Sequence, residues 1–231
     1  MDDSAPHPHR DLDGKVALIV GGSRNHGAAC AEHVAARGAA TVFSYSGDER
    51  AAEETLTALD RYGVTAEASR SDATVSAAVD TLFEGIVARH GRLDIVVHVP
   101  IAILDKRLAD CTDEDFDRLI DVNTRSAFHS LRAAARHVSD GGRCVVLSTA
   151  FTAGAPGAYG LSAGSKAAVE HMVRASAREL APRGVTVNAV APGPVPGLDR
   201  YADIAHVVGR LLGAEASAVS GRVIRADGAS T

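Results

Sequence analysis

The chain has 231 residues, of which 46% are hydrophobic and 23% are charged, and its formal net charge at pH 7 is −5. These values are ordinary for a soluble globular protein, and the length predicts one domain with a sizeable core. The negative charge offers no basic surface for nucleic acid, and no apolar run approaches the roughly 18 residues of a membrane span. The acidic start, Met1 to Ser4, is unlike a signal peptide, so we expect a cytoplasmic protein.

Cysteine and histidine usage indicates neither a disulfide framework nor a metal site. Cys30, Cys111 and Cys144 are widely spaced without a Cys-x-x-Cys motif, and we expect Cys30 and Cys144 to be buried, inert thiols. The ten histidines include no pair with a convincing ligand spacing, so no metal is predicted. Residues 1–10 form a polar tail that we expect to be disordered, and residues 11–231 form the predicted domain.

Apolar β-branched runs alternate with helical patterns along the whole chain. The expected strands are 16–20, 40–45, 64–69, 93–99, 144–149, 185–190 and 223–225. The expected helices are 27–37, 49–62, 75–90, 113–138, 159–181 and 204–212. Strands of near-continuous hydrophobicity, separated by helices of this length, predict a parallel sheet covered on both faces. Right-handed crossovers then give an α/β, doubly wound, Rossmann-like fold.

A glycine-rich loop follows the first expected strand. Residues 21–27 read Gly-Gly-Ser-Arg-Asn-His-Gly and lead into a helix. Glycine lets backbone amides approach a pyrophosphate at the positive end of a helix. Asn25 tolerates a positive φ better than most residues, although its side chain would crowd the closest phosphate approach. We therefore interpret the loop either as a nucleotide-binding turn or as a turn retained only for folding.

The most specific pattern lies around Lys166. Residues 158–170 read Ala-Tyr-Gly-Leu-Ser-Ala-Gly-Ser-Lys-Ala-Ala-Val-Glu, and residues 188–193 read Asn-Ala-Val-Ala-Pro-Gly. With the glycine loop and the C-terminal segment 219–228, these motifs resemble the short-chain dehydrogenase/reductase family over about residues 11–231. The family's proton donor is a tyrosine four residues before the lysine, and here that position is Ser162. A serine hydroxyl has no accessible phenolate state, and the side chain is much too short.

The resemblance implies that any nucleotide bound is NADP(H). The second strand ends Ser44-Tyr45-Ser46, without an acidic residue for a free ribose 2′-hydroxyl, and Arg24 stands where many relatives hold the 2′-phosphate. Asp72 matches an aspartate that contacts adenine, or else it is a solvated loop acid. The nucleotide-binding residues implied are Gly21, Ser23, Arg24, Asn25, Gly27, Asp72 and Lys166.

The resemblance also implies roles for residues near the missing acid. Asn123 matches the asparagine that holds a water of the proton relay, or it satisfies backbone groups at a helix irregularity. Thr149 matches the serine that orients a carbonyl, with Ser148 as a neighbouring substitute. Lys166 matches the lysine that contacts the nicotinamide ribose and lowers the pKa of the acid.

Tyr159 is a possible replacement for the missing acid. It lies seven residues before Lys166, close to two helical turns, so both side chains can face one side of the helix. This spacing resembles the enoyl-thioester reductases of the same superfamily, but Tyr159 also matches a frequent aromatic residue of ordinary members. The candidate catalytic residues are therefore Lys166, Asn123, Thr149, Tyr159 and Ser162.

Two further segments depart from the family pattern. The family has Asn-Asn-Ala-Gly after the fourth strand, whereas this chain has His98-Val99-Pro100-Ile101, in which we expect a neutral, packed His98. Only nine residues, 194–202, separate the Pro-Gly corner from the next expected helix, where the family has a long segment that closes over the substrate. The cleft is then either open or closed by another chain.

Three functions follow as hypotheses. The first is an NADP(H)-linked, ketoreductase-like oxidoreductase of a small-molecule substrate, with an atypical site and a place in bacterial biosynthetic metabolism that rests on composition alone. The second is an inactive subunit of a homo- or hetero-oligomer that pairs with an active paralogue. The third is a non-redox cyclase, dehydratase or isomerase. The residues proposed for an oligomer interface are Phe116, Leu119, Phe128, Val169 and Val173, although core packing alone explains them equally well. The polar residues available for non-redox chemistry are Ser162, Ser148, Tyr159 and His98.

Overall fold

The computed structural model describes residues 10–154, 157–193 and 200–228, and a parallel sheet runs through these ranges. Its strands are β1 (Val16–Val20), β2 (Ala40–Tyr45), β3 (Ala66–Arg70), β4 (Ile95–His98), β5 (Arg143–Leu147), β6 (Thr186–Pro192) and β7 (Val223–Ala226). The strand order is β3-β2-β1-β4-β5-β6-β7, and every neighbouring pair is parallel. This is the predicted doubly wound, Rossmann-like fold.

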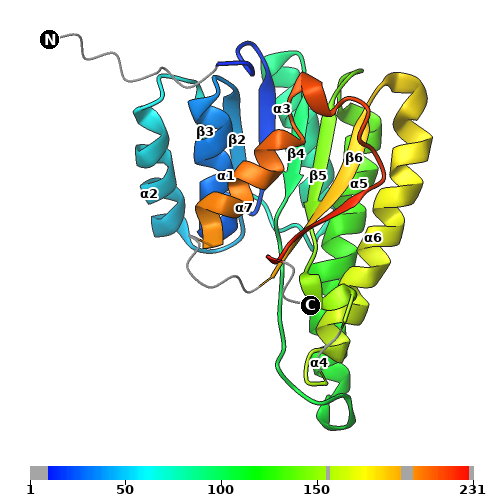
Figure 1. Cartoon of the computed structure of the whole chain (residues 1–231). Helices are drawn as coiled ribbons and strands as arrows, with labels where there is room; N and C mark the ends of the chain where they lie inside the picture. Colours follow the sequence, from blue (N-terminus) through cyan, green and yellow to red (C-terminus); the bar gives the residue numbers. More distant parts are fainter. Residues whose placement is uncertain (1–9, 155–156, 194–199, 229–231) are drawn as a thin grey trace, which may run out of the picture.

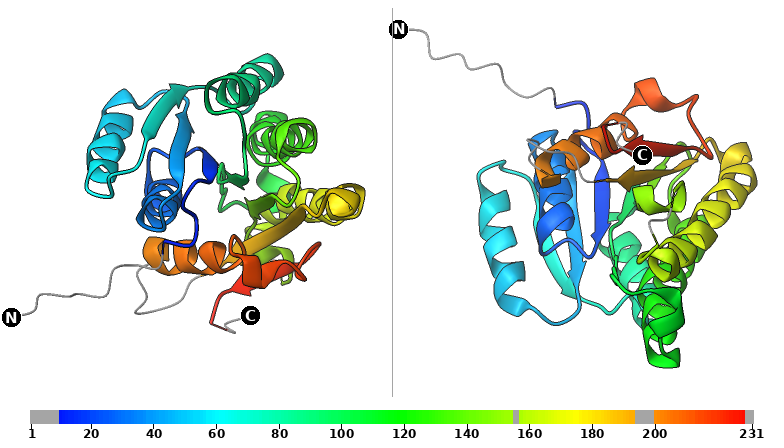
Figure 2. Two further views of the ribbon diagram at one scale, coloured as in Figure 1. Left: turned by 90° about the horizontal axis from the view of Figure 1, so that it is seen from above. Right: turned by 60° about the horizontal axis from the view of Figure 1, so that its bottom comes forward.

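Helices cover both faces of the sheet. They are α1 (Asn25–Ala36), α2 (Glu49–Asp60), α3 (Ser76–His90), α4 (Asp113–Leu119), α5 (Ser126–His137), α6 (Gly160–Leu180) and α7 (Arg200–Arg210). Helices α1, α2 and α7 pack on one face, and α3, α5 and α6 on the other, as Figures 1 and 2 show. Two separate apolar clusters result, one on each face, and both are built from buried strand residues of β1, β4 and β5.

Short helical turns connect several of these elements. Four are 3₁₀ helices, η1 (Leu108–Asp110), η3 (Ala150–Thr152), η4 (Ala181–Arg183) and η5 (Ala214–Ala216). The fifth, η2 (Ile120–Arg125), is a π-helix between α4 and α5. The predicted helix 113–138 is helical from Asp113 to His137, but residues 120–125 within it form wider, π-helical turns. Such turns are rare and occur mainly at functional sites.

The carboxyl ends of the strands carry the site. After β4 the chain runs beyond this edge of the sheet to α4, which projects from the body together with the first turns of α6 (Figure 1). Ligands of open α/β sheets bind outside the carboxyl edge, where the strand order reverses. In this order the reversal lies between β1 and β4.

The structure tests the predictions about the cysteines, a membrane span and the N-terminal tail. Cys30 and Cys144 are buried free thiols, and burial raises the pKa of each to about 12. Cys111 is also free and is half-buried. No helix in the described ranges is both long and apolar enough to cross a bilayer. The predicted tail 1–10 lies outside the described residues except for Arg10.

Candidate functional site

The glycine-rich loop between β1 and α1 depends on three backbone positions. Gly21 has a φ of 77° and Asn25 a φ of 52°, the left-handed conformation that asparagine tolerates. At Gly27, a Cβ atom would lie 2.0 Å from the carbonyl oxygen of Gly21, so only glycine fits without displacing the backbone. The helix α1 that follows has neither a capping side chain nor an acidic residue in its first turn. Its positive end is therefore suited to an anion.

Strand β2 and helix α2 hold this loop from the adjacent side. The buried Ser44 accepts hydrogen bonds from the amide of Gly21 through Oγ (3.2 Å) and from the amide of Gly22 through its carbonyl oxygen (2.9 Å). Arg24 forms an exposed ion pair with Asp48 at 3.3 Å. Beside them lies an open hollow of about 570 Å³ between α1 and α2, lined in part by Ser23, Arg24 and Asn25. The loop thus fits the phosphate end of a dinucleotide.

Asp72, at the carboxyl end of β3, has a local structural role. It is exposed, and its Oδ1 accepts hydrogen bonds from the amide (2.9 Å) and the hydroxyl (2.8 Å) of Thr74. This geometry is a side-chain-stabilised turn. The structure supports the interpretation of Asp72 as a loop acid and supplies no additional sign of an adenine contact.

Strand β4 ends in a buried histidine and a proline that packs on the glycine loop. His98 is 1% exposed, and its ring nitrogens lie 2.9 Å from Ser130 Oγ and 3.2 Å from Ser126 Oγ. Burial and the nearby Lys166 lower the pKa of His98 well below its usual value, so the ring is neutral and packed as predicted. The ring of Pro100 lies 3.2 Å from where a Cβ of Gly21 would stand.

Residues Pro100–Lys106 form an extended segment, called the strap below, that runs from β4 across the start of α6. Asn123, on the π-helix, bonds both backbone polar groups of Ala102: its Oδ1 accepts from the Ala102 amide (2.7 Å), and its Nδ2 donates to the Ala102 carbonyl (2.8 Å). Ser162 does the same for Leu104, accepting from the amide (2.8 Å) and donating to the carbonyl (3.1 Å). Both side chains are buried.

The outer end of the strap is held by residues just before α6. The Lys106 amide donates to the Ala158 carbonyl (2.7 Å), and the Tyr159 hydroxyl donates to Asp105 Oδ2 (2.8 Å). The ring of Tyr159 stacks on Phe151 at 4.4 Å between centroids. The hydrogen bond to the Asp105 carboxylate raises the pKa of Tyr159, which makes the phenol a weaker acid than usual.

Lys166 lies under the inner end of the strap. Its side chain is fully buried, and Nζ donates to the carbonyl oxygens of Pro100 (2.9 Å) and Leu147 (2.8 Å). Desolvation lowers the pKa of Lys166 to about 7. The resemblance implies a lysine that faces a ribose, whereas here the ammonium group contacts the protein's own backbone.

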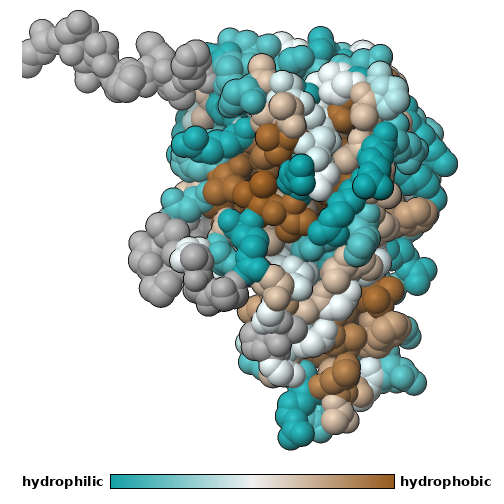
Figure 3. All heavy atoms as spheres, turned by 45° about the vertical axis from the view of Figure 1, so that its right-hand side comes forward, coloured by the Kyte–Doolittle hydropathy of each residue, from teal (hydrophilic) through white to brown (hydrophobic). Residues whose placement is uncertain are grey.

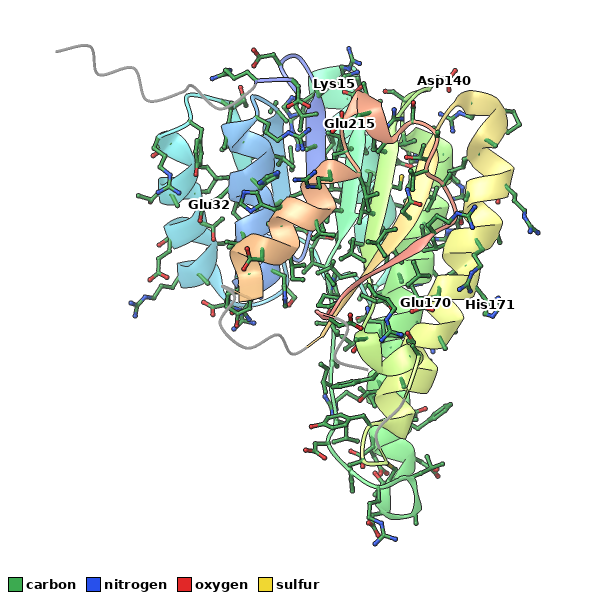
Figure 4. The ribbon with its side chains drawn as sticks, viewed as in Figure 1. Lys15, Glu32, Asp140, Glu170, His171 and Glu215 are labelled. Carbon is green, nitrogen blue, oxygen red and sulfur yellow. The ribbon has the colours of Figure 1, made fainter. Side chains whose placement is uncertain are left out.

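Three hydroxyl side chains that follow β5 also form hydrogen bonds within the protein. Ser148 Oγ and Thr152 Oγ1 each donate to Glu170 Oε1 at 2.7 Å, and Figure 4 labels this buried carboxylate on α6. Thr149 is 4% exposed and caps the following turn through the amide of Phe151. Sequence reasoning missed Glu170, although its position four residues after Lys166 places it on the same helix face.

Four of the five predicted catalytic side chains therefore converge, but on the strap, whereas Thr149 caps the turn after β5. Asn123 contacts Ala102, Ser162 contacts Leu104, Tyr159 contacts Asp105, and Lys166 contacts Pro100. The strap itself was not predicted, because its residues have no motif and its contacts are to backbone atoms. No cluster of three or more metal-binding side chains occurs in the ranges that the structure describes.

Comparisons with known proteins establish the family. The family model described as enoyl-(acyl carrier protein) reductase matches residues 22–227. A short chain dehydrogenase/reductase of Cryptosporiopsis, dmxR18, is 34% identical over 257 residues that cover 96% of this chain and 97% of the relative. The chain belongs to the short-chain dehydrogenase/reductase family.

Two further proteins are similar to this chain over most of its length. Hydroxynaphthalene reductase arp2 of Aspergillus fumigatus is 39% identical over 185 residues, covering 80% of this chain and 67% of the relative. A crystal structure of a short chain dehydrogenase from Burkholderia cenocepacia in complex with NADP has a TM-score of 0.88 at 32% identity, covering 94% of this chain and 98% of that one. The alignment with dmxR18 spans more positions, 257, than this chain has residues, 231. This chain is therefore shorter than that relative in internal segments.

Proposed function

We propose that this chain binds NADP(H) through its glycine-rich loop and does not reduce a carbonyl by itself, acting as a subunit beside an active member of its family. One observation carries the proposal: the position of the family's tyrosine acid is Ser162, whose hydroxyl is bonded to the Leu104 peptide in both directions. A buried hydroxyl that already donates to a backbone carbonyl has no proton to give a substrate. The burial of Lys166 supports the same conclusion.

The nucleotide part of the proposal rests on the loop. Gly21 and Gly27 permit the tight turn that leads into the positive end of α1, and Arg24 is an exposed cation at the same end. NADP in the Burkholderia structure supports the choice of nucleotide. When bound, NADPH would supply a hydride, and Ser23, Arg24 and Asn25 are the side chains placed to hold its adenosine phosphate end. The free cysteines favour a reducing compartment, which is consistent with the cytoplasm.

Calorimetric titration tests the nucleotide proposal. We expect NADPH to bind at least about tenfold more tightly than NADH, because a guanidinium forms charge-assisted bonds with the extra phosphate. Arg24→Ala should remove most of this preference and leave NADH binding unchanged. Arg89→Ala is the matched control, since Arg89 is similarly exposed but pairs with Glu67 beside α3. Equal affinity for both nucleotides in the wild type would contradict the role of Arg24.

The partner surface is proposed from exposed apolar side chains. Of the five residues suggested by the sequence, Leu119, Val169 and Val173 are fully buried within the chain and cannot contact a partner, so core packing, the alternative explanation, accounts for these three. Phe116 on α4 is 50% exposed and Phe128 on α5 is 44% exposed. Figure 3 shows apolar surface at the projecting end that carries α4. The molar mass from light scattering distinguishes a chain that pairs with itself from one that needs a different partner.

A second candidate function is an NADPH-linked reductase in which Tyr159 donates the proton. The relatives named as reductases favour it, as does the exposed position of the Tyr159 hydroxyl at the outer end of the strap. The raised pKa of Tyr159 opposes it. The strap also keeps Tyr159 and Lys166 apart, since each binds an opposite end of it.

NADPH consumption with a hydroxynaphthalene, the substrate class in the name of the arp2 relative, separates the two functions. We expect the wild type and Tyr159→Phe to be equally inactive. Turnover by the wild type that falls about a hundredfold or more in Tyr159→Phe would establish the second candidate and remove the first. Turnover that Tyr159→Phe does not change would exclude both proposals: the chain would be active, and Tyr159 would not be its proton donor.

A further inference from the structure

The strap has the hydrogen-bonding pattern of a strand laid across the site. The amides of alternate residues, Ala102, Leu104 and Lys106, are each bonded to a group outside the strap, at 2.7, 2.8 and 2.7 Å. These three residues are half-buried, whereas Ile103 and Asp105 between them are exposed. The segment is thus held along its length and presents one side to the protein, as an edge strand does.

Ser162 occupies the central position of this arrangement. The residue is only 1% exposed, and its hydroxyl bonds both the backbone amide and the carbonyl oxygen of Leu104. A serine can act in this way because its hydroxyl donates once and accepts twice. A tyrosine at this position would extend its ring through the space that the strap occupies. Serine in place of the family's tyrosine therefore does two things at once: it removes the proton donor, and it provides the hydroxyl that binds the strap.

Lys166 is the group that the strap covers. Its amine is sealed from solvent and bound to the first carbonyl of the strap, that of Pro100. We infer that Pro100–Lys106 is an internal strap that closes the reduction site of this chain, and that Ser162 is the positioning residue that fastens it. The inference rests on the proposed function, in which this site does not catalyse reduction, and it names the structural element that closes the site.

Amine labelling tests whether the strap covers Lys166, and each lysine can be followed separately because the chain has only three. The side chain of Lys15 is 44% exposed and lies outside the strap, so it serves as the internal reference, whereas Lys166 is buried. Lys106 is 35% exposed but belongs to the strap. With an acetylating reagent at pH 7.5 and site-specific mass spectrometry, Lys166 of the wild type should remain unlabelled while the other two react. Ser162→Ala should raise the labelling rate of Lys166 by about tenfold or more, because loss of the fastening bonds shifts the local opening equilibrium.

Two controls separate local opening from general damage. Ser148→Ala removes a buried hydroxyl from the same end of the sheet, but one that is bonded to Glu170 and not to the strap, so Lys166 should stay protected. The buried thiols of Cys30 and Cys144 report global unfolding, since a thiol reagent should reach only Cys111 in a folded variant. Neither control involves a nucleotide, so a failure of NADPH binding and a failure of the strap are distinguishable.

Three results would overturn the inference. They are labelling of Lys166 in the wild type at the rate of Lys15, an unchanged rate in folded Ser162→Ala, and equal opening by Ser148→Ala. If Ser162→Ala does not fold, hydrogen exchange of the wild type decides instead. The amides of Ala102, Leu104 and Lys106 should then exchange more slowly than those of Ile103 and Asp105, and equal rates would show that the strap is not fastened.

Discussion

Gly27→Ala is expected to destabilise the fold by about 3 kcal/mol and to abolish nucleotide binding. The added Cβ would lie 2.0 Å from the carbonyl oxygen of Gly21 and 2.9 Å from Cα of Gly22, and both are backbone atoms that no side-chain rotation can move. The loop must therefore shift away from the start of α1, where the phosphate would bind. For a chain of this size, the loss corresponds to roughly 10 °C in Tm.

Urea unfolding followed by circular dichroism measures this loss, with Gly47→Ala as the matched control. A Cβ at Gly47 meets no atom within 4 Å, although this glycine also lies in a loop at the carboxyl edge, after β2. Alanine there should be neutral or slightly stabilising, because it restricts the unfolded chain. If Gly27→Ala unfolded at the urea midpoint of the wild type, the tight turn between β1 and α1 would not exist in solution.

The free energy of unfolding should rise by about 1.5 kcal/mol between pH 7 and pH 8.5, because of Lys166. The pKa of this lysine falls from 10.5 to about 7 in the folded protein, since burial disfavours the ammonium form. Between these two values the unfolded chain binds more protons than the folded one, so stability increases with pH. In Lys166→Met this part of the pH dependence should disappear, whatever the absolute stability of the variant.

The pH window isolates Lys166 from other shifted groups. The pKa of His33 is lowered to about 4, so its contribution changes below pH 6.5, whereas the thiols of Cys30 and Cys144 destabilise folding only above about pH 9. Lys106→Met is the control, because Asp115 raises the pKa of Lys106 and its titration lies above the window. A wild-type stability that did not change from pH 7 to 8.5 would mean that the Lys166 ammonium is solvated.

The sheet was predictable because its strands are buried on both faces. β1 and β2 have the expected bounds, since each is a run of apolar and β-branched residues. β3 begins two residues later than expected, at Ala66, because its residues are only half-buried and the apolar pattern is weak there. The π-helix within the predicted helix 113–138 was not predictable for another reason: a single wider turn leaves the apolar spacing on either side intact, so periodicity cannot reveal it.

The site was predictable only as a list of residues. Counting from Lys166 identifies Ser162 and so reveals the lost acid, but spacing cannot say what replaces a missing side chain. The replacement is the Leu104 peptide, a backbone group that any sequence would offer. The hydrogen bonds of the buried Lys166 ammonium group were missed for the same reason, since both of its partners are backbone carbonyl oxygens. Contacts made by side chains to backbone leave little signal in a sequence.

The π-helix Ile120–Arg125 has a consequence for how this chain tolerates insertions and deletions. Such a turn contains one residue more than an α-helical turn, so deleting one residue between α4 and α5 would convert the three elements into one uninterrupted α-helix. Each residue of an α-helix is rotated by about 100° from the last, so everything on one side of the deletion would turn by that angle. A change that improves helical regularity would thereby carry the amide of Asn123 away from the peptide of Ala102. The irregular turn thus sets the direction in which Asn123 points, and its length is constrained by the hydrogen bond to Ala102, 21 residues earlier in the chain.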